Sequence, residues 1–363
     1  NTPELLNLDS TTGATVLAKG TVNERPETPT FSVNYLVVAG GGGGGGGQQA
    51  GGGGGAGGYR SSVAGESSGG NTSAETPLAL TKSTNYAVTV GEGGAGGSSS
   101  YGGNGTNSVF STIISTGGGG GGTGSSYAGQ DGGSGGGASD RNGQNGGTAV
   151  TSPVTQGFSG ANITGLNSSY RGGSGGGGAG QAGQLGTYPG GGYTGVGGDG
   201  GDGLASSITG TSTYRAGGGA GGSQGTSVQG IGGQGGGGNG ETTSNNNGSS
   251  GTPNTGGGGG GSNYNSSFTG YDGGSGIVIV RYPNAYDITV GSGLTTGTLN
   301  TAVGSNEKYT TFTAGTGTIS FSGTVVGDEN KATDGTLRFN TDTNKTEYFD
   351  GTGWYEIVDE YAS

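Results

Sequence analysis

Long glycine tracts, more than glycine content alone, constrain what this chain can fold into. Glycine accounts for 103 of the 363 residues. The longest uninterrupted tracts cover residues 40–47, 51–55, 117–122 and 256–261. The array starts directly after the apolar run 35–39 and ends directly before the apolar run 277–282. A flexible glycine linker does not need strand-like flanks, so we expect the array itself to be folded.

The cost of ordering glycine predicts how the tracts are held. Each glycine loses roughly 0.5–1 kcal/mol more than alanine on folding, and only 26% of the residues are hydrophobic, so side-chain burial is insufficient to offset this cost. A polyproline II backbone has about three residues per turn and no internal hydrogen bonds, so its N–H and C=O groups can bond to neighbouring tracts. Only glycine lacks the Cβ that blocks such close approach. We expect a bundle of polyglycine II helices, with disordered tracts as the alternative.

Short runs of alternating or β-branched residues predict strands that flank the tracts. These runs cover residues 85–91, 108–114, 286–290, 308–313 and 318–322, with a C-terminal meander at 336–339, 346–349 and 354–358. No segment has helical periodicity. The predicted fold class is therefore mainly β plus a polyglycine II bundle, with no α-helix.

Composition divides the chain into four predicted regions. They are an N-terminal arm or linker (1–31), a glycine-rich polyglycine II domain (32–282), a small β region (283–327) and a C-terminal β-meander (328–363). The meander is too short to fold alone. It is expected to pack on the rest of the chain or on copies of itself, which favours a homo-oligomer such as a trimer.

Several function classes lack the residues that they require. Histidine and cysteine are absent, which removes Ser-His-Asp and Cys-His catalysis and zinc sites built on thiolate or imidazole. The net charge is −12 with no basic run, so nucleic-acid binding is not expected. No apolar run approaches the length of a membrane span, and the G-x-G-x-x-G matches arise by chance at this glycine density. We expect a protein that is not an enzyme and has no cofactor, although a carboxylate-pair hydrolase remains formally open.

Two acids in the glycine array form a weak candidate for calcium binding. Asp199 and Asp202 lie in Gly-Gly-Asp-Gly-Gly-Asp-Gly-Leu at residues 197–204, which fits one nonapeptide of a calcium-binding β-roll. A β-roll needs tandem copies and the chain has one. Solvated loop acids are the preferred interpretation, and no metal is expected.

Aromatic residues beside polar connections are the candidate receptor-binding residues, because rings in polar loops commonly contact sugars or protein surfaces. They are Tyr127, Phe158, Tyr170, Tyr188, Tyr193, Tyr214, Tyr264, Phe268 and Tyr271. The alternative, that these rings cap the edge of the lattice, stays equally open.

Four signatures keep their order along the chain: Tyr-Leu-Val-Val-Ala-Gly-Gly-Gly at 35–42, Gly-Gly-Gly-Ala-Gly-Gly-Tyr-Arg at 53–60, Val-Thr-Val-Gly-Glu-Gly-Gly-Ala-Gly at 88–96, and the segment 273–282. Together they resemble the glycine-rich domain family of bacteriophage tail fibres and tail-tip adhesins. The resemblance implies a sandwich of polyglycine II helices whose end loops bind the bacterial surface.

Two further segments resemble parts of phage proteins. Residues 334–354 are similar to short β-modules of phage virion proteins, and residues 308–321 resemble the β segment that often precedes such a glycine-rich domain. Here that segment follows the domain, so we expect the chain to be cut from a longer modular array.

These resemblances favour a non-enzymatic virion component located on the virion or outside the cell. It would be a tail fibre or adhesin that presents loops to a host-surface glycan or outer-membrane protein, with other virion proteins as partners and no membrane insertion. The alternative is a purely structural protein, such as a fibre shaft, capsid decoration or extracellular filament. A carbohydrate-degrading spike is a third class.

Overall fold

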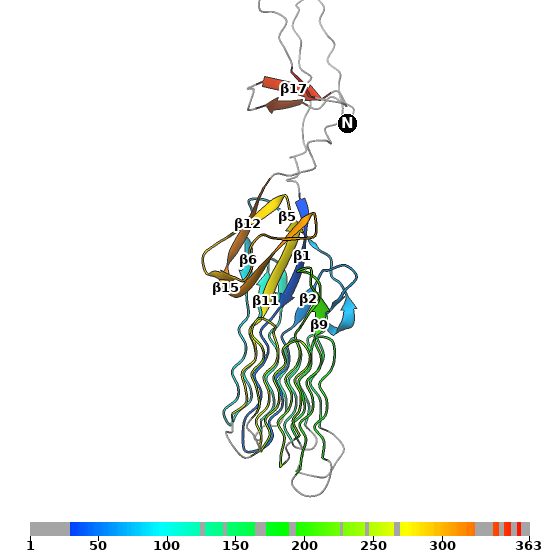
Figure 1. Cartoon of the computed structure of the whole chain (residues 1–363), viewed down its shortest axis with the longest axis vertical. Helices are drawn as coiled ribbons and strands as arrows, with labels where there is room; N and C mark the ends of the chain where they lie inside the picture. The colour runs from blue at the N-terminus through cyan, green and yellow to red at the C-terminus, as the bar shows by residue number, and fades with distance from the viewer. Residues whose placement is uncertain are drawn as a thin grey trace, which may run out of the picture.

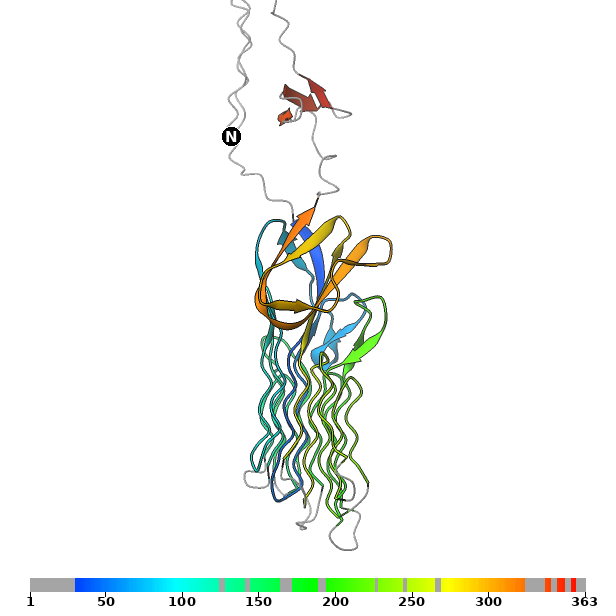
Figure 2. The same ribbon diagram turned by 60° about the vertical axis from the view of Figure 1, so that its left-hand side comes forward.

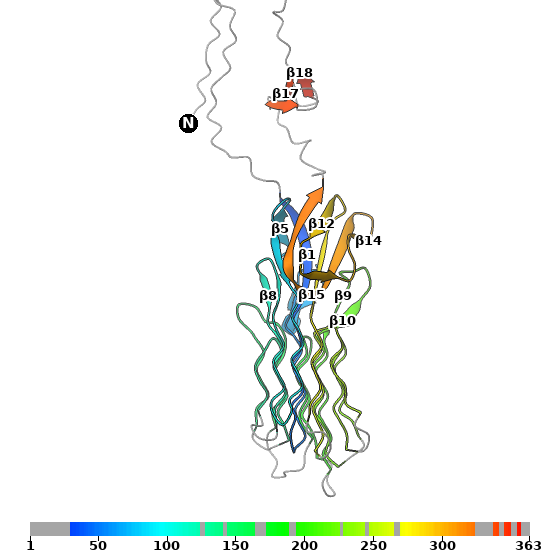
Figure 3. The ribbon, with the colours of Figure 1, turned by 90° about the vertical axis from the view of Figure 1, so that its left-hand side faces the viewer.

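The fold combines an antiparallel sheet with a bundle of glycine tracts that extends from one end of that sheet. The computed structural model describes residues 30–323, apart from 124–127, 141–143, 164–171, 189–193, 226–227, 244–246 and 265–268, together with three C-terminal strands. Figure 1 shows the sheet above the bundle, and Figures 2 and 3 show the same arrangement from other sides.

Short strands precede, interrupt and follow the tracts. In chain order they are β1 Thr30–Val38, β2 Tyr59–Ser61, β3 Ser67–Ser68, β4 Thr72–Ser73, β5 Leu78–Thr81, β6 Tyr86–Thr89, β7 Ser108–Phe110, β8 Ile113–Ser115, β9 Leu204–Ser206, β10 Thr213–Arg215, β11 Ile277–Pro283, β12 Tyr286–Val290, β13 Leu294–Thr296, β14 Thr301–Val303, β15 Glu307–Gly323, β16 Leu337–Asn340, β17 Lys345–Phe349 and β18 Trp354–Glu356. A single 3-10 turn, η1 Gly69–Asn71, is the one helical element among the described residues.

The strands that open and close the glycine array pair with each other. β1 and β11 run antiparallel, with Leu36 opposite Ile279. They are neighbours in an 11-stranded sheet whose main order is β2-β1-β11-β15-β6-β7-β8. The sheet is antiparallel and nearly closed into a barrel. Pairing of β1 with β11 therefore holds the two ends of the array together.

The long strand β15 bends at Gly315, whose φ of 91° favours glycine. Before the bend β15 pairs with β11, and after it β15 pairs with β6 and β12. Strands that follow residue 283 therefore complete the same sheet as those that precede the tracts.

Both faces of the sheet are buried, so β1 is apolar at successive positions. Tyr35 and Val37 pack into one core, and Leu36 and Val38 pack into a second core on the opposite face. In the first core the rings of Phe31 and Tyr286 stack with their centroids 3.9 Å apart.

The glycine tracts run back and forth beside one another and are neither strand nor helix in segments such as 40–46. Successive N–H groups in tract 40–45 donate in turn to residues 103–106, 271–274 and 52–55, and this order repeats every three residues. The three-residue repeat is the one that a polyproline II backbone has. The polyglycine II conformation itself stays a prediction.

Tract 40–45 is enclosed by other tracts on all sides. Besides donating to three antiparallel segments, its carbonyl groups accept hydrogen bonds from three parallel segments at residues 94–97, 118–121 and 259–262. A Cβ atom on Gly44 would lie 1.9 Å from the carbonyl oxygen of Gly260, a separation that real Cβ atoms do not reach. The positions of tract 40–45 therefore accept glycine alone.

The expectation of an all-β chain is confirmed, since the only helical element in the described part is η1. The C-terminal strands β16, β17 and β18 form an antiparallel three-stranded sheet in the predicted order. No described helix has the length and apolar character needed to cross a membrane. The homo-oligomer stays a prediction.

Candidate functional site

In some tracts at the edge of the bundle, residues other than glycine recur at positions that face solvent. In tract 194–203, Asp199 and Asp202 are exposed and Val196 is partly exposed, and these residues are three positions apart. Between them, a Cβ on Gly200 would lie 1.9 Å from the carbonyl oxygen of Gly218. The three-residue repeat thus gives a tract at the edge of the bundle one row of side chains along its open face.

Two neighbouring edge tracts follow the same rule. One carries the exposed row Gln181, Gln184 and Thr187, and the other carries the exposed row Val228, Ile231 and Gln234. Each row has a residue at every third position. Three parallel rows of side chains therefore cover this face of the bundle.

The acids in the middle row complete hydrogen bonds at the lattice edge. Asp199 Oδ1 accepts the backbone N–H of Ile231 at 2.7 Å, and Asp202 Oδ1 accepts the backbone N–H of Gln234 at 2.7 Å. Within the bundle such an N–H would meet the carbonyl of a further tract. Each carboxylate supplies that acceptor where no further tract lies.

The same arrangement recurs elsewhere on the edge of the bundle. Asp131 Oδ1 accepts the N–H of Thr148 at 2.6 Å, and Asn104 Oδ1 accepts the N–H of Gly120 at 2.8 Å. An aspartate or asparagine at an open position is therefore a general way to finish an edge, because its side chain is short and carries an acceptor.

Asp199 and Asp202 have no third acidic residue beside them in the described structure that could complete a calcium site. Nowhere in the described ranges do three histidine, cysteine, aspartate or glutamate residues gather so as to hold a metal ion. Each of the two carboxylates also has one oxygen committed to a lattice N–H. The geometry supports a structural role at the edge for both acids.

Some of the nine candidate aromatic residues lie outside the described residues. These are Tyr127, Tyr170, Tyr193 and Phe268. Phe158 and Tyr271 lie within tracts, where their backbone groups bond to neighbouring tracts. A Cβ on Gly248 would lie 2.2 Å from the ring of Tyr271, so this ring packs against the lattice. Burial, followed by the neighbouring Glu241, raises the pKa of Tyr271.

The remaining three candidates are more accessible. Tyr188 and Tyr264 each end a tract directly before a connection outside the described residues, and Tyr264 is 38% exposed. Tyr214 lies on β10, beside the sheet, and is 43% exposed. The structure thus separates candidates at the tract ends from one candidate at the other end of the bundle.

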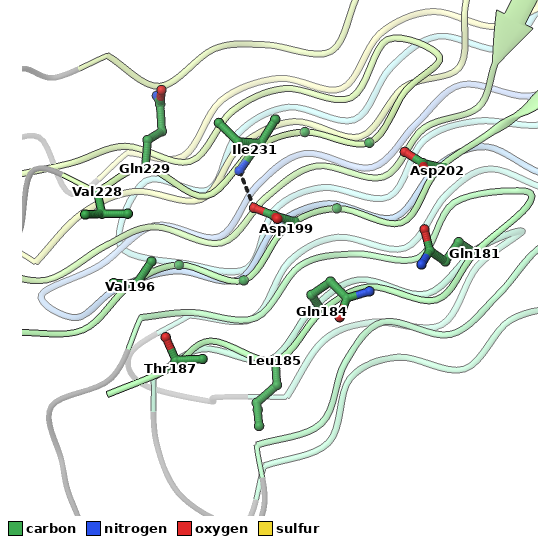
Figure 4. Close-up of a pocket in the computed structure, with 15 residues that line it drawn as sticks. Gln181, Gln184, Leu185, Thr187, Val196, Asp199, Asp202, Val228, Gln229 and Ile231 are labelled. Carbon is green, nitrogen blue, oxygen red and sulfur yellow. Dashed lines mark hydrogen bonds between the residues drawn. The ribbon is translucent and has the colours of Figure 1, made fainter. Parts of the chain in front are cut away.

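A groove runs along the three rows of edge side chains, and Figure 4 shows it in close-up. The groove has a volume of about 650 Å3, with Asp199 and Val196 in its middle row and Gln184 and Ile231 in the flanking rows. A second cavity of about 620 Å3 shares Gln181 and Asp202 with it and reaches Tyr214. The two cavities form one continuous path.

The charge of this path is uniformly acidic. Its acidic lining residues are Asp199, Asp202 and Glu66, and no lysine or arginine of the described ranges lines it. The glutamines of the groove could not be predicted as binding residues from the sequence. A polar residue at every third position of a tract indicates an exposed row only when the tract is known to lie at the edge of the bundle.

Comparison with known proteins bears on the glycine array. A family model described as a glycine-rich domain matches residues 16–283. The chain belongs to the glycine-rich domain family. No curated protein and no solved structure matches it.

The matched part of this glycine-rich domain ends at Pro283, the last residue of β11. It includes every tract and the pairing of β1 with β11. The long strand β15 lies beyond the match and still pairs with β11 through residues 307–312. The glycine-rich domain of this protein is therefore completed by strands outside the matched region.

Proposed function

We propose that this glycine-rich domain protein is a non-enzymatic virion component of a bacteriophage, a tail fibre or adhesin that attaches to a host-surface glycan or outer-membrane protein. The observation that carries the proposal is the position of accessible aromatic side chains at the ends of a rigid bundle. Tyr188 and Tyr264 each lie directly before a connection outside the described residues. The tracts of the bundle extend away from the sheet (Figure 1). Other virion proteins would hold the opposite end.

The rigidity of the bundle supports such a role. Interior tracts are hydrogen-bonded to neighbours on all sides, so the connections start from fixed points. Binding by groups that are already held in position loses less conformational entropy than binding by a mobile chain. A fixed lattice is therefore suited to present groups for recognition.

A purely structural role, as a fibre shaft, capsid decoration or extracellular filament, is the second candidate. It is favoured by the packing of Tyr271 against Gly248, because that ring serves the lattice. If all candidate rings behave like Tyr271, the lattice itself is the function.

Adsorption of the purified, labelled protein to a panel of bacterial strains distinguishes the two roles. We expect binding to some strains, and loss of that binding when Tyr127, Tyr170, Tyr188 and Tyr264 are changed together to alanine, while the melting temperature stays unchanged. Ile114→Ala is the control, since Ile114 is a 49% exposed apolar residue on β8 in the sheet. Adsorption that survives the combined variant would favour the structural role.

A further inference from the structure

The three rows of side chains along the groove are in register with one another. Gln184 N–H donates to the carbonyl of Asp199 at 2.8 Å, and Gly200 N–H donates to the carbonyl of Ile231 at 2.9 Å. Gln184, Asp199 and Ile231 therefore lie at one level across the groove, and Figure 4 shows them side by side.

The same register repeats above and below this level. On one side Gln181, Asp202 and Gln234 lie together, since Gly180 N–H bonds to the carbonyl of Asp202 and Gly203 N–H bonds to that of Gln234. On the other side lie Thr187, Val196 and Val228, of which Thr187 and Val196 exchange two backbone hydrogen bonds. Consecutive levels are three residues apart, which corresponds to about 9 Å along a polyproline II backbone. The groove thus presents a periodic series of levels.

The two levels that contain Asp199 and Asp202 offer both hydrogen-bond donors and acceptors. Gln181 and Gln184 each have an exposed amide that makes no side-chain hydrogen bond within the described chain. Asp199 and Asp202 each keep a second carboxylate oxygen that has no hydrogen-bond partner among the described residues. The N–H groups of these two aspartates also have no acceptor in the described structure.

These unpartnered groups suit a ligand that is rich in hydroxyl groups. A hydroxyl group both donates and accepts, so it can bond to an amide, a carboxylate or a peptide N–H. The lattice fixes the carboxylates through Ile231 and Gln234, which lowers the entropy that binding would cost. At the end near the sheet, the partly exposed ring of Tyr214 offers an apolar face.

The charge of the groove selects among such ligands. Among the residues that the structure describes, its lining contains aspartate and glutamate but no basic residue, so an anionic chain would be repelled. The spacing of about 9 Å between levels gives the groove a regular repeat along its length. A linear, regularly repeating and uncharged polymer fits both features.

We infer that this groove binds an uncharged polysaccharide chain in an extended conformation, lying along the tracts from Tyr214 towards Val228. Gln181, Gln184, Asp199 and Asp202 make the polar contacts. The site is on the side of the bundle and is separate from the tract-end tyrosines, so the inference does not depend on attachment through Tyr188 and Tyr264.

Isothermal titration of the full chain with linear hexasaccharides tests this inference. The probes are cellohexaose, xylohexaose and mannohexaose as uncharged chains, with hexagalacturonate as an anionic chain and poly-L-proline as an extended peptide. We expect at least one uncharged hexasaccharide to bind, and the anionic chain and the peptide to show no binding.

Variants locate the site. The double substitution Gln181→Leu and Gln184→Leu is expected to weaken binding by about tenfold, since it removes two neutral hydrogen bonds. Gln130→Leu, on another tract, is the matched control and should leave binding unchanged. Melting temperatures confirm that each variant folds.

Three results would overturn the inference: no uncharged hexasaccharide binds, the double variant binds as the native chain does, or poly-L-proline binds in place of the sugars. Loss of cell adsorption in the tract-end tyrosine variant, with hexasaccharide binding retained, would leave both sites standing. If that variant still adsorbs to cells and the groove binds a hexasaccharide, only the proposal of attachment through the tract-end tyrosines is contradicted.

Discussion

A Cβ atom on Gly120 would lie 1.8 Å from the carbonyl oxygen of Gly102, which belongs to a neighbouring tract. The obstacle is backbone, and it is held in place because Gly102 N–H donates to the carbonyl of Gly121 at 3.0 Å. The two tracts are therefore unable to separate without breaking the bonds that join them.

Gly120→Val should for this reason be severely destabilising. Overpacking costs about 1–3 kcal/mol, and each lattice hydrogen bond that is lost adds about 0.5–1.5 kcal/mol. We expect either failure to fold or a decrease in the free energy of unfolding of about 3 kcal/mol or more, measured by chemical denaturation.

Two variants at less crowded positions serve as controls. A Cβ on Gly103 would meet its nearest atom, the nitrogen of Ala95, at 3.1 Å, so Gly103→Ala should cost less than Gly120→Val. Ala95 is exposed, and Ala95→Ser should be close to neutral. Equal stability of all three variants would contradict the close packing of the tracts.

The edge role of Asp199 predicts a difference between two substitutions. Asp199→Asn keeps a side-chain oxygen that can accept the N–H of Ile231, and should leave the stability nearly unchanged. Asp199→Leu removes this acceptor and should lower the free energy of unfolding by about 0.5–1.5 kcal/mol. Denaturation curves of the two variants give the comparison, and an equal loss of stability in both would show that the charge of Asp199, which both variants remove, matters and the hydrogen bond does not.

Buried tyrosines predict a loss of stability in alkaline solution. Burial raises the pKa of Tyr282 to about 12, against about 10 for an ordinary tyrosine. Below a pH of about 10 the phenol is protonated in both the folded and the unfolded chain, so its contribution to the free energy of unfolding is fully present. As the pH rises from there through the folded pKa, the unfolded chain ionises first and the stability falls. Burial raises the pKa values of Tyr35 and Tyr59 in the same direction.

Tyr282→Phe tests this prediction, because it removes the ionisable group and retains the ring. The variant loses the hydrogen bond from the tyrosine hydroxyl to Asn300 Oδ1, which is 2.6 Å long, and should be less stable at neutral pH. Its stability should fall less steeply than that of the native chain above a pH of about 10. If the free energy of unfolding, measured by urea denaturation, falls equally with pH in the variant and the native chain, Tyr282 is not responsible.

Strands with strong local patterns could be predicted from the sequence, and those that depend on a bend could not. The run 286–290 became β12 with the same bounds. The run 108–114 became the hairpin β7–β8, because Ser111 adopts a φ of 54° and turns the chain. The runs 308–313 and 318–322 became the single strand β15, which continues through the bend at Gly315.

By itself, the sequence determined that the glycine array folds as a backbone-bonded lattice between two apolar strands, since continuous glycine without a side-chain core leaves the backbone as the source of stability. Only the tertiary structure decided which tracts lie inside and which lie at the edge. Asp199 and Ile231 are 32 residues apart in the chain, as are Asp202 and Gln234. Their contacts depend on the order in which tracts pack, and the glycines that make up most of each tract carry no side chains to encode that order locally.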